Sequence, residues 1–371
     1  ALGVGGRSES GVVVRQRRWP SVLLPIGCVA LLLAFGSIAS SFADNVVSKP
    51  VGFVRLTATS NQEILVSIPF DAFDASINAV LKGQLIGATN AEGADHVFKW
   101  DVSGQQYLSA FLADDTGQTN RDGLWFEDDV NWITSTLAFH PGEGFWIESR
   151  HPGTQAVYLA GTIVLAGTNS VTLGPALNLF SYPFSSRIAL NNSDLAADGA
   201  YAASSVIDAD MITDVASNRN FWLLDDTNSA NHWKWLDEDN VLANEFLTLG
   251  RGYWYNRRTT NEFTWSEPRP YADPFPRDNN PPCVTAMTFN AQGDQVTLCI
   301  SARGVSGETL EIYYQDFSPT NAFDSTNGWK IAAQGLSTSN QTDLQWIDNG
   351  SGGRGAITVV FARYYVVARS D

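Results

Sequence analysis

The sequence predicts an all-β protein with two homologous β-rich domains in tandem and a C-terminal β-sandwich of the immunoglobulin or fibronectin kind. Short alternating stretches rich in β-branched and aromatic residues run along the chain between Gly, Pro and Asn turns. A ten-residue motif also occurs twice, 108 positions apart. A third observation is a series of six short strand patterns that follows a Pro-rich stretch. The 371 residues are enough for two or three domains.

The first element is an export signal. Three arginines between residues 15 and 18 precede an apolar run over 22–38, and residues 41–43 offer small side chains where a signal peptidase cleaves. We therefore expect 1–43 to be an N-terminal extension and secretory signal peptide. A retained membrane anchor is the alternative, because such a run is long enough to cross a bilayer. The protein is expected to be secreted or on the cell surface, with no membrane span after cleavage.

The remainder of the chain is acidic. The net charge is −16, and the first 43 residues contribute +3, which leaves −19 for the body. A surface of this sign repels phosphate backbones, so nucleic acid is excluded as an expected partner. Charged residues make up 17%, against a usual value of about 25%. The remaining polar surface is typical of extracellular β-rich folds.

The repeated motif lies at 141–150 and 249–258. A Pro-Gly pair suits a type II turn, and a following glycine in a strand permits the close approach of another backbone. A catalytic role for Glu143 is disfavoured, because the second occurrence has Arg251 at that place. The positions that recur are therefore interpreted as structural. They are Gly142, Gly144 and Trp146, matched by Gly250, Gly252 and Trp254.

A second pattern, Leu-x-Ser-x-Pro-Phe, recurs at 65–70 and 179–184. Its proline closes the strand, because proline cannot donate to a β-ladder. Together the two patterns predict a first segment over 44–160 and a second segment over 161–271. Between the two patterns, the alignment matches Asp95 with Asp210, Tyr107 with Trp222, and Trp125 with Trp233.

Residues 272–282 contain four prolines and are expected to form a semi-rigid linker before a β-sandwich over 283–371. Two cysteines remain after the signal, Cys283 and Cys299, and an exported protein with two cysteines favours a disulfide. Strand alternation places Cys299 on an outer face and Cys283 on a core face, so a bridge needs a bulge between them. Two separate buried thiols are the alternative.

Acidic loops are candidates for Ca²⁺. Asp114, Asp115 and Asp122 form one cluster, and 127–129 and 237–239 lie at matched places in the two segments. Oxygen-rich loops of this kind can hold Ca²⁺, although residues 118–129 depart from an EF-hand loop at both ends. Solvated loops are the simpler interpretation, so no cofactor is assigned.

Aromatic residues are the remaining candidates for a ligand. Trp side chains near the loops that differ most between the segments offer flat faces for sugars or peptides, whereas packing in a core is the usual role of Trp. The weak ligand candidates are Trp125, Trp132, Trp233 and Trp235. The four histidines belong to no metal or nucleophile motif, and no catalytic residue is assigned.

Leu-x-Ser-x-Pro-Phe, a Trp-containing strand and Pro-Gly-Glu-Gly-Phe-Trp, in tandem, resemble the repeat of large uncharacterised bacterial secreted proteins. Residues 311–314, 328–331, 344–348 and 363–367 resemble a fibronectin type III-like terminal module of the same proteins. The resemblance implies architecture and no activity. We therefore expect a non-enzymatic surface or matrix protein whose partners are proteins or glycans and which could self-assemble. The alternatives are a carbohydrate-binding protein that uses the Trp-rich loops and a glycan-active hydrolase.

Overall fold

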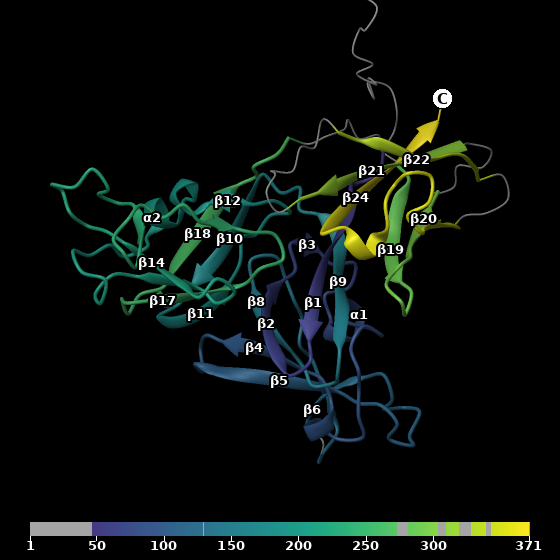
Figure 1. Ribbon diagram of the computed structural model, residues 1–371, viewed down its shortest axis with the longest axis horizontal. Coiled ribbons are helices and arrows are strands. Elements are labelled where there is room, and N and C mark those ends of the chain that lie inside the picture. Colours follow the sequence, from purple (N-terminus) through teal and green to yellow (C-terminus); the bar gives the residue numbers. More distant parts are fainter. Residues whose placement is uncertain are drawn as a thin grey trace, which may run out of the picture. The chain divides into compact units, whose positions relative to one another are not determined.

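The computed structural model describes residues 47–128, 130–272, 281–302, 309–318, 328–338 and 343–370, all within one compact unit. Antiparallel strands dominate these residues, so the all-β prediction is confirmed (Figure 1). Helical structure within the described ranges is limited to short pieces, and none of it is long and apolar enough to cross a membrane. These pieces are α1 (Ile77–Val80), α2 (Leu195–Asp198), and the 3-10 turns η1 (Ala91–Gly93), η2 (Leu190–Asn192) and η3 (Ile357–Val359).

One six-stranded sheet joins the two ends of the described chain. Its order is β22 (Lys330–Ser337), β21 (Thr309–Phe317), β24 (Ala362–Ser370), β1 (Val51–Thr59), β9 (Thr154–Ile163) and β3 (Phe70–Asp71). The first strand, β1, lies inside this sheet and pairs with β9 on one side and with β24 on the other. The first segment and the C-terminal residues therefore share a β-ladder.

A second sheet belongs to the first segment and a third to the second segment. The second sheet runs β2 (Gln62–Ser67), β8 (Gly144–Ser149), β4 (His96–Asp101), β5 (Gln106–Leu112), β6 (Trp125–Asp128) and β7 (Ile133–Thr134). The third runs β11 (Ala176–Phe180), β17 (Tyr253–Arg257), β13 (Met211–Asp214), β14 (Arg219–Leu223) and β15 (Trp235–Asp237). The first five strands follow the same order in both. Leu65 faces Trp146 in one sheet, and Leu179 faces Trp254 in the other.

Smaller sheets complete the described residues. In the second segment β10 (Thr168–Leu173) pairs with β18 (Phe263–Pro268), and β12 (Ile188–Ala189) pairs with β16 (Phe246–Leu247). In the C-terminal part β19 (Cys283–Phe289), β20 (Val296–Ser301) and β23 (Asp343–Asp348) form a three-stranded sheet. Its inner residues share a hydrophobic core with β21, β24 and the first-segment side chains Phe53 and Tyr158.

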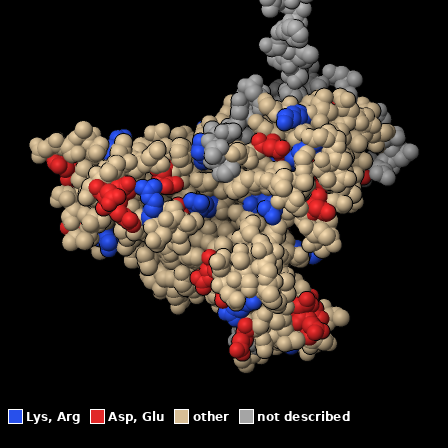
Figure 2. All heavy atoms as spheres, in the orientation of Figure 1, with Lys and Arg blue, Asp and Glu red and all other residues tan. Residues whose placement is uncertain are grey.

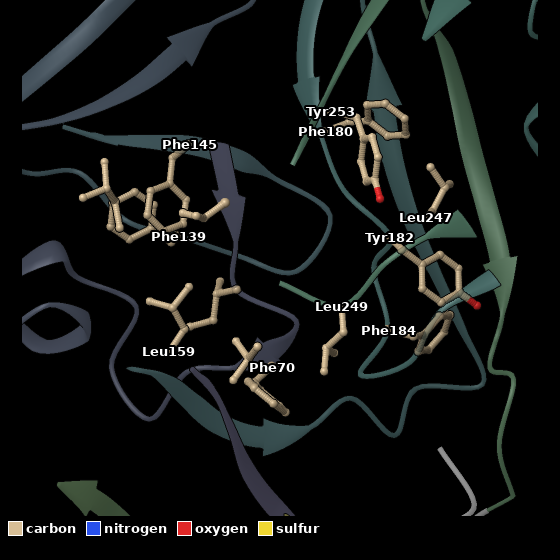
Figure 3. Close-up of a cluster of buried hydrophobic side chains, with 14 of the residues drawn as sticks. Phe70, Phe139, Phe145, Leu159, Phe180, Tyr182, Phe184, Leu247, Leu249 and Tyr253 are labelled. Atoms are coloured by element: carbon tan, nitrogen blue, oxygen red, sulfur yellow. The ribbon is translucent and has the colours of Figure 1, made fainter. Parts of the chain in front are cut away.

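A single larger core extends through both segments. Phe139 stacks on Phe145 in the first segment with ring centroids 4.1 Å apart, and Phe180 contacts Tyr253 in the second with centroids 5.9 Å apart. All four side chains belong to one cluster of buried residues, which Figure 3 shows. The division of the chain at 160, 271 and 282 stays a prediction about sequence units. The structure adds that the first segment and the C-terminal part share a sheet and that hydrophobic cores extend across the units, while 273–280 of the linker lie outside the described residues.

The two cysteines are free thiols in this structure. A bulge does lie between Val284 and Ala286, and it turns Cys283 to the outer face instead of the predicted core face. Cys283 then faces Ser301, while Cys299 faces Ala286. The cysteines are thus diagonal neighbours, and diagonal Cα atoms are about 7–8 Å apart, which is longer than a disulfide readily spans.

Candidate functional site

The two sequence motifs meet each other across the two segments. Ser67, from the Leu-x-Ser-x-Pro-Phe pattern of the first segment, donates its hydroxyl to the carbonyl of Arg251 in the second segment at 3.2 Å. Ser181, its counterpart, donates to the carbonyl of Glu143 in the first segment at 3.3 Å. The backbone N–H groups of the same serines donate to the carbonyls of the first glycine in the facing motif, at 3.1 and 2.9 Å. The contact is therefore reciprocal.

The glycines of the motif are explained by this contact. A Cβ on Gly252 would lie 2.9 Å from the carbonyl oxygen of Val66, and one on Gly144 would lie 3.3 Å from that of Phe180. The first glycine of each motif has a positive φ, +94° and +75°, as the third position of a type II turn requires. Close backbone approach was expected here, and the approaching backbone is the strand of the other segment.

The charged residue of the motif forms an ion pair whose polarity is reversed between the segments. Glu143 accepts a hydrogen bond from the Lys99 ammonium group at 2.8 Å. Arg251 donates to Asp214 at 2.8 Å. Lys99 on β4 and Asp214 on β13 are equivalent, because each lies four residues beyond the matched aspartate of its segment. The change from Glu143 to Arg251 is thus compensated by the change from Lys99 to Asp214, which is what a structural ion pair requires.

The matched aspartates, Asp95 and Asp210, are fully buried anchors of loop structure. Each carboxylate accepts the backbone N–H of the residue nine positions before it, and also that of the first residue after β8 or β17. Acceptance of several N–H groups stabilises a buried carboxylate. The donors are Ile86 and Arg150 in the first segment and Tyr201 and Arg258 in the second.

The predicted match of Trp125 with Trp233 is wrong, and Trp125 is equivalent to Trp235. Trp125 donates its backbone N–H to the side chain of Asn78 at 3.1 Å, and Trp235 donates to Asn191 at 2.8 Å. Both indoles are buried, at 0% and 1% exposure. These two candidates are core residues and do not present a face to a ligand.

The other two Trp candidates lie in different surroundings. Trp233 takes the place of Gly123, since both have positive φ and both close the loop before β6 or β15. Its side chain is 46% exposed. Trp132 is partly covered by the guanidinium of Arg121, 4.2 Å from the ring centroid, and by Phe126. The four candidates therefore form no row of exposed rings.

The match of Tyr107 with Trp222 is also wrong, because the β4–β5 hairpin is two residues longer on each strand than β13–β14. The extra length lets the hairpin reach the second segment. There Trp100 donates its indole N–H to the Leu177 carbonyl at 2.8 Å, and its ring meets that of Trp254 at 5.2 Å. A single offset across the two hairpins displaced the matches on β5. The match of Trp125 failed separately, because Trp235 lies 15 positions before Gly250 whereas Trp125 lies 17 positions before Gly142.

The acidic loops are held by local hydrogen bonds. Asp122 accepts both the backbone N–H and the hydroxyl of Thr116, at 2.9 and 2.6 Å, and the hydroxyl bond is the main cause that lowers the pKa of this carboxyl. Glu127 accepts the N–H of Thr136, while Asp129 lies outside the described residues. Within the described ranges no group of three or more His, Cys, Asp or Glu side chains is arranged to hold a metal ion.

Two of the hollows among the described residues are considered as places for a ligand. One, of about 580 Å³, lies beside α1, β9 and β19 and has an apolar lining that includes Tyr158 stacked on Phe289. The other, of about 750 Å³, belongs to the second segment. The aromatic and charged side chains of its lining are those of Tyr201, Asp208, Asp225 and Arg258. Sequence reasoning singled out none of these four for binding, because each stands alone in its stretch.

Comparison with known proteins gives no match: no family model, no curated protein and no solved structure corresponds to the chain.

Proposed function

We propose that the chain is an exported, non-enzymatic protein of the cell surface or extracellular matrix that acts through contacts with other proteins or glycans. One observation carries the proposal: the serines and glycines of the repeated motifs are occupied in holding the two segments together. Ser67 and Ser181 bind the facing motifs, and the glycines admit the facing backbones. The shared chemistry of the chain is therefore architectural.

We infer further that the two segments are tandem repeats of one domain. The equal strand order of their sheets, the equal anchoring of Asp95 and Asp210, and the reciprocal motif contact support this. In a reciprocal contact the motif surfaces of the two segments cover each other, so neither is left for a second copy of the chain. Any self-assembly of the protein must therefore use a surface other than the motif.

The surface is suited to contacts that depend on shape and hydrogen bonds more than on charge. Most of the face drawn in Figure 2 is uncharged, with Asp and Glu groups dispersed among Lys and Arg. The chain has 39 acidic and 23 basic residues, so a strongly acidic partner would be repelled.

The proposal is tested by expressing the chain with its own N-terminus in a bacterial host and fractionating the cells. Export with cleavage after Ala43, measured by intact mass, is expected. The exported protein is then assayed for binding to surface extracts and a glycan panel, with and without Ca²⁺. A chain that stays in the cytoplasm with its N-terminus intact contradicts the proposal.

A glycan-active hydrolase is the second candidate, and one observation favours it. Asp208 and Asp225 line the same hollow of the second segment. Glycoside hydrolysis generally uses two carboxylic acids on either side of the scissile bond. Release of reducing ends from a bound glycan, lost in an Asp225→Asn variant, would support this candidate and contradict the non-enzymatic proposal.

A further inference from the structure

We propose that the hollow lined by Tyr201, Asp208, Asp225 and Arg258 in the second segment is a binding site for an uncharged oligosaccharide. This inference rests on the proposed function and names the class of ligand. It replaces the Trp-rich loops as the expected glycan site, since Trp125 and Trp235 are buried.

Buried hydrogen bonds fix the hollow. The Asp210 carboxylate lies beneath it and accepts the N–H of Tyr201 at 2.8 Å and that of Arg258 at 2.7 Å. Asp225 donates its N–H to the carbonyl of Ala203 at 2.8 Å, which joins the loop after β14 to the other wall. The walls are thus positioned before a ligand arrives, which reduces the entropy lost on binding.

The side chains that line the hollow have unused hydrogen-bonding capacity. Within the described residues, the Tyr201 hydroxyl, the Asp208 carboxylate and the terminal nitrogens of Arg258 form no hydrogen bond or ion pair with protein. Tyr201 is also 45% exposed, so its ring offers a flat apolar face. A sugar presents an apolar face of C–H groups surrounded by hydroxyls that donate and accept. This combination of groups fits a sugar in a hollow of about 750 Å³.

The first segment provides an internal comparison, because its equivalent loop has the same length but a different chemistry. Ile86 stands where the second segment has Tyr201, and Gly93 stands where it has Asp208. Arg150, the counterpart of Arg258, donates to the carbonyls of Ala91 and Glu92 and pairs with Glu148 at 3.0 Å. The terminal nitrogens of the guanidinium are therefore occupied in the first segment and accessible in the second, where only Nε of Arg258 donates, to the Ala209 carbonyl at 3.3 Å.

The charges around the hollow favour an uncharged ligand. Two carboxylates and one guanidinium line the hollow, and the body of the protein carries −19. His232 lies 3.3 Å from Asp225 and offsets part of the negative charge only when it is protonated. Anionic polysaccharides are therefore disfavoured by repulsion, while neutral hydroxyls can bind both signs of charge.

The test uses the exported chain on an array of neutral oligosaccharides of glucose, galactose, mannose, xylose and N-acetylhexosamines, with uronic-acid and sulfated glycans as the anionic arm. Binding to at least one neutral glycan is expected. Tyr201→Ile, which installs the residue of the first segment, should weaken this binding at least about tenfold, since it removes the stacking ring. Ile86→Ala, at the matched position of the first segment, is the control and should leave binding unchanged.

Three results overturn the inference: no neutral glycan bound, binding to anionic glycans alone, or equal binding by the Tyr201→Ile variant. Circular dichroism and thermal unfolding of each variant show whether a loss of binding is caused by a loss of fold. Asp225→Asn is a second variant, in which the side chain keeps its shape and loses its charge. An exported protein that binds no neutral glycan removes this inference and leaves the proposed function standing. A protein that is not exported removes the proposed function itself.

Discussion

Ser67 donates its side-chain hydroxyl to the backbone carbonyl of Arg251, which lies 184 positions later in the chain. The same bond is made in the opposite direction by Ser181 and Glu143. Within one segment the Ser pattern and the Gly-x-Gly pattern lie far apart in the sequence but on paired strands, β2 with β8 and β11 with β17. In the folded chain the Ser pattern of each segment also binds the Gly-x-Gly pattern of the other segment. Both patterns recur because the same contact is formed twice.

Closing the space at this interface should destabilise the protein. In Gly252→Ala the new methyl group would lie 2.9 Å from the Val66 carbonyl oxygen and from the Leu65 Cγ atom, so a backbone or side chain must move. We expect the free energy of unfolding to fall by about 1–3 kcal/mol, as for other overpacked sites. Chemical denaturation of both proteins measures it.

Gly167→Ala is the matched control, because a Cβ at that position has no atom within 4 Å. The control should change the free energy of unfolding by less than about 0.5 kcal/mol. Equal stability of Gly252→Ala and the parent would show that the segments do not meet as closely as described.

The Lys99–Glu143 ion pair can be given the opposite polarity, which is that of the Arg251–Asp214 pair in the second segment. Lys99→Asp alone places two carboxylates together at Glu143, and Glu143→Arg alone places two cations together. The double variant restores an attraction with the polarity of the Arg251–Asp214 pair. The side chains of Lys99 and Glu143 are 21% and 35% exposed, so we expect a coupling energy of only about 0.5–1 kcal/mol. A double-mutant cycle from denaturant unfolding measures it, and strict additivity of the two changes would contradict the compensation.

The sequence predicted the all-β class, the existence of the repeated motif and its structural role, because alternation and turn chemistry are local signals. It could not predict that β1 pairs with β24, since that ladder joins residues more than 300 positions apart. The candidate site was missed for a related reason. The backbone N–H groups of Tyr201 and Arg258 meet at the buried carboxylate of Asp210, and no spacing in the sequence records those bonds.

The errors about Trp233 and Cys283 share one physical cause, which is a local insertion or deletion of residues. Trp235 lies two positions closer to Gly250 than Trp125 lies to Gly142, and this difference shifted the match onto Trp233. A bulge at Val284 moved Cys283 from one face to the other. Because side chains alternate along a strand, one inserted residue reverses every later assignment of faces.

The buried ionic cluster of the C-terminal part should influence the whole described unit. Asp348 is fully buried, which would raise its pKa, but bonds from Arg354, the Gly350 N–H, Tyr365 and Arg363 hold the pKa below its usual value. Asp348→Ala leaves Arg363 with one carboxylate fewer and should cost about 3 kcal/mol. Since β24 pairs with β1, calorimetry should show one transition that moves to lower temperature.

Asp343→Ala is the control for this change, because Asp343 is exposed at the start of the same strand. It should leave the transition close to that of the parent. Two separate transitions in the Asp348→Ala variant, with the higher one unmoved, would show that the shared β1–β24 ladder does not couple the C-terminal part to the first segment.

The buried carboxyl of Glu267 should make the stability of the protein depend on pH. It is 1% exposed, and burial raises the pKa of its carboxyl to about 7, even though the Asp194 N–H and the Trp265 indole N–H donate to it. In the unfolded chain the same carboxyl titrates near 4.5. A raised folded pKa means that the protonated form favours the native state. Its contribution is complete below pH 4.5 and is lost as the pH rises from there through about 7.

Glu267→Gln should therefore flatten this dependence and stabilise the protein above pH 7, because glutamine is neutral and still accepts the two N–H bonds. We expect a gain on the order of 2–3 kcal/mol at pH 8 and almost none at pH 4.5. Denaturant unfolding across this pH range measures the difference, with Glu262→Gln as a control, because Glu262 is exposed and lies just before the same strand, β18. A Glu267→Gln variant with a pH profile parallel to that of the parent would show that Glu267 is ionised in the native state throughout, with its charge satisfied by Trp265 and Asp194 alone.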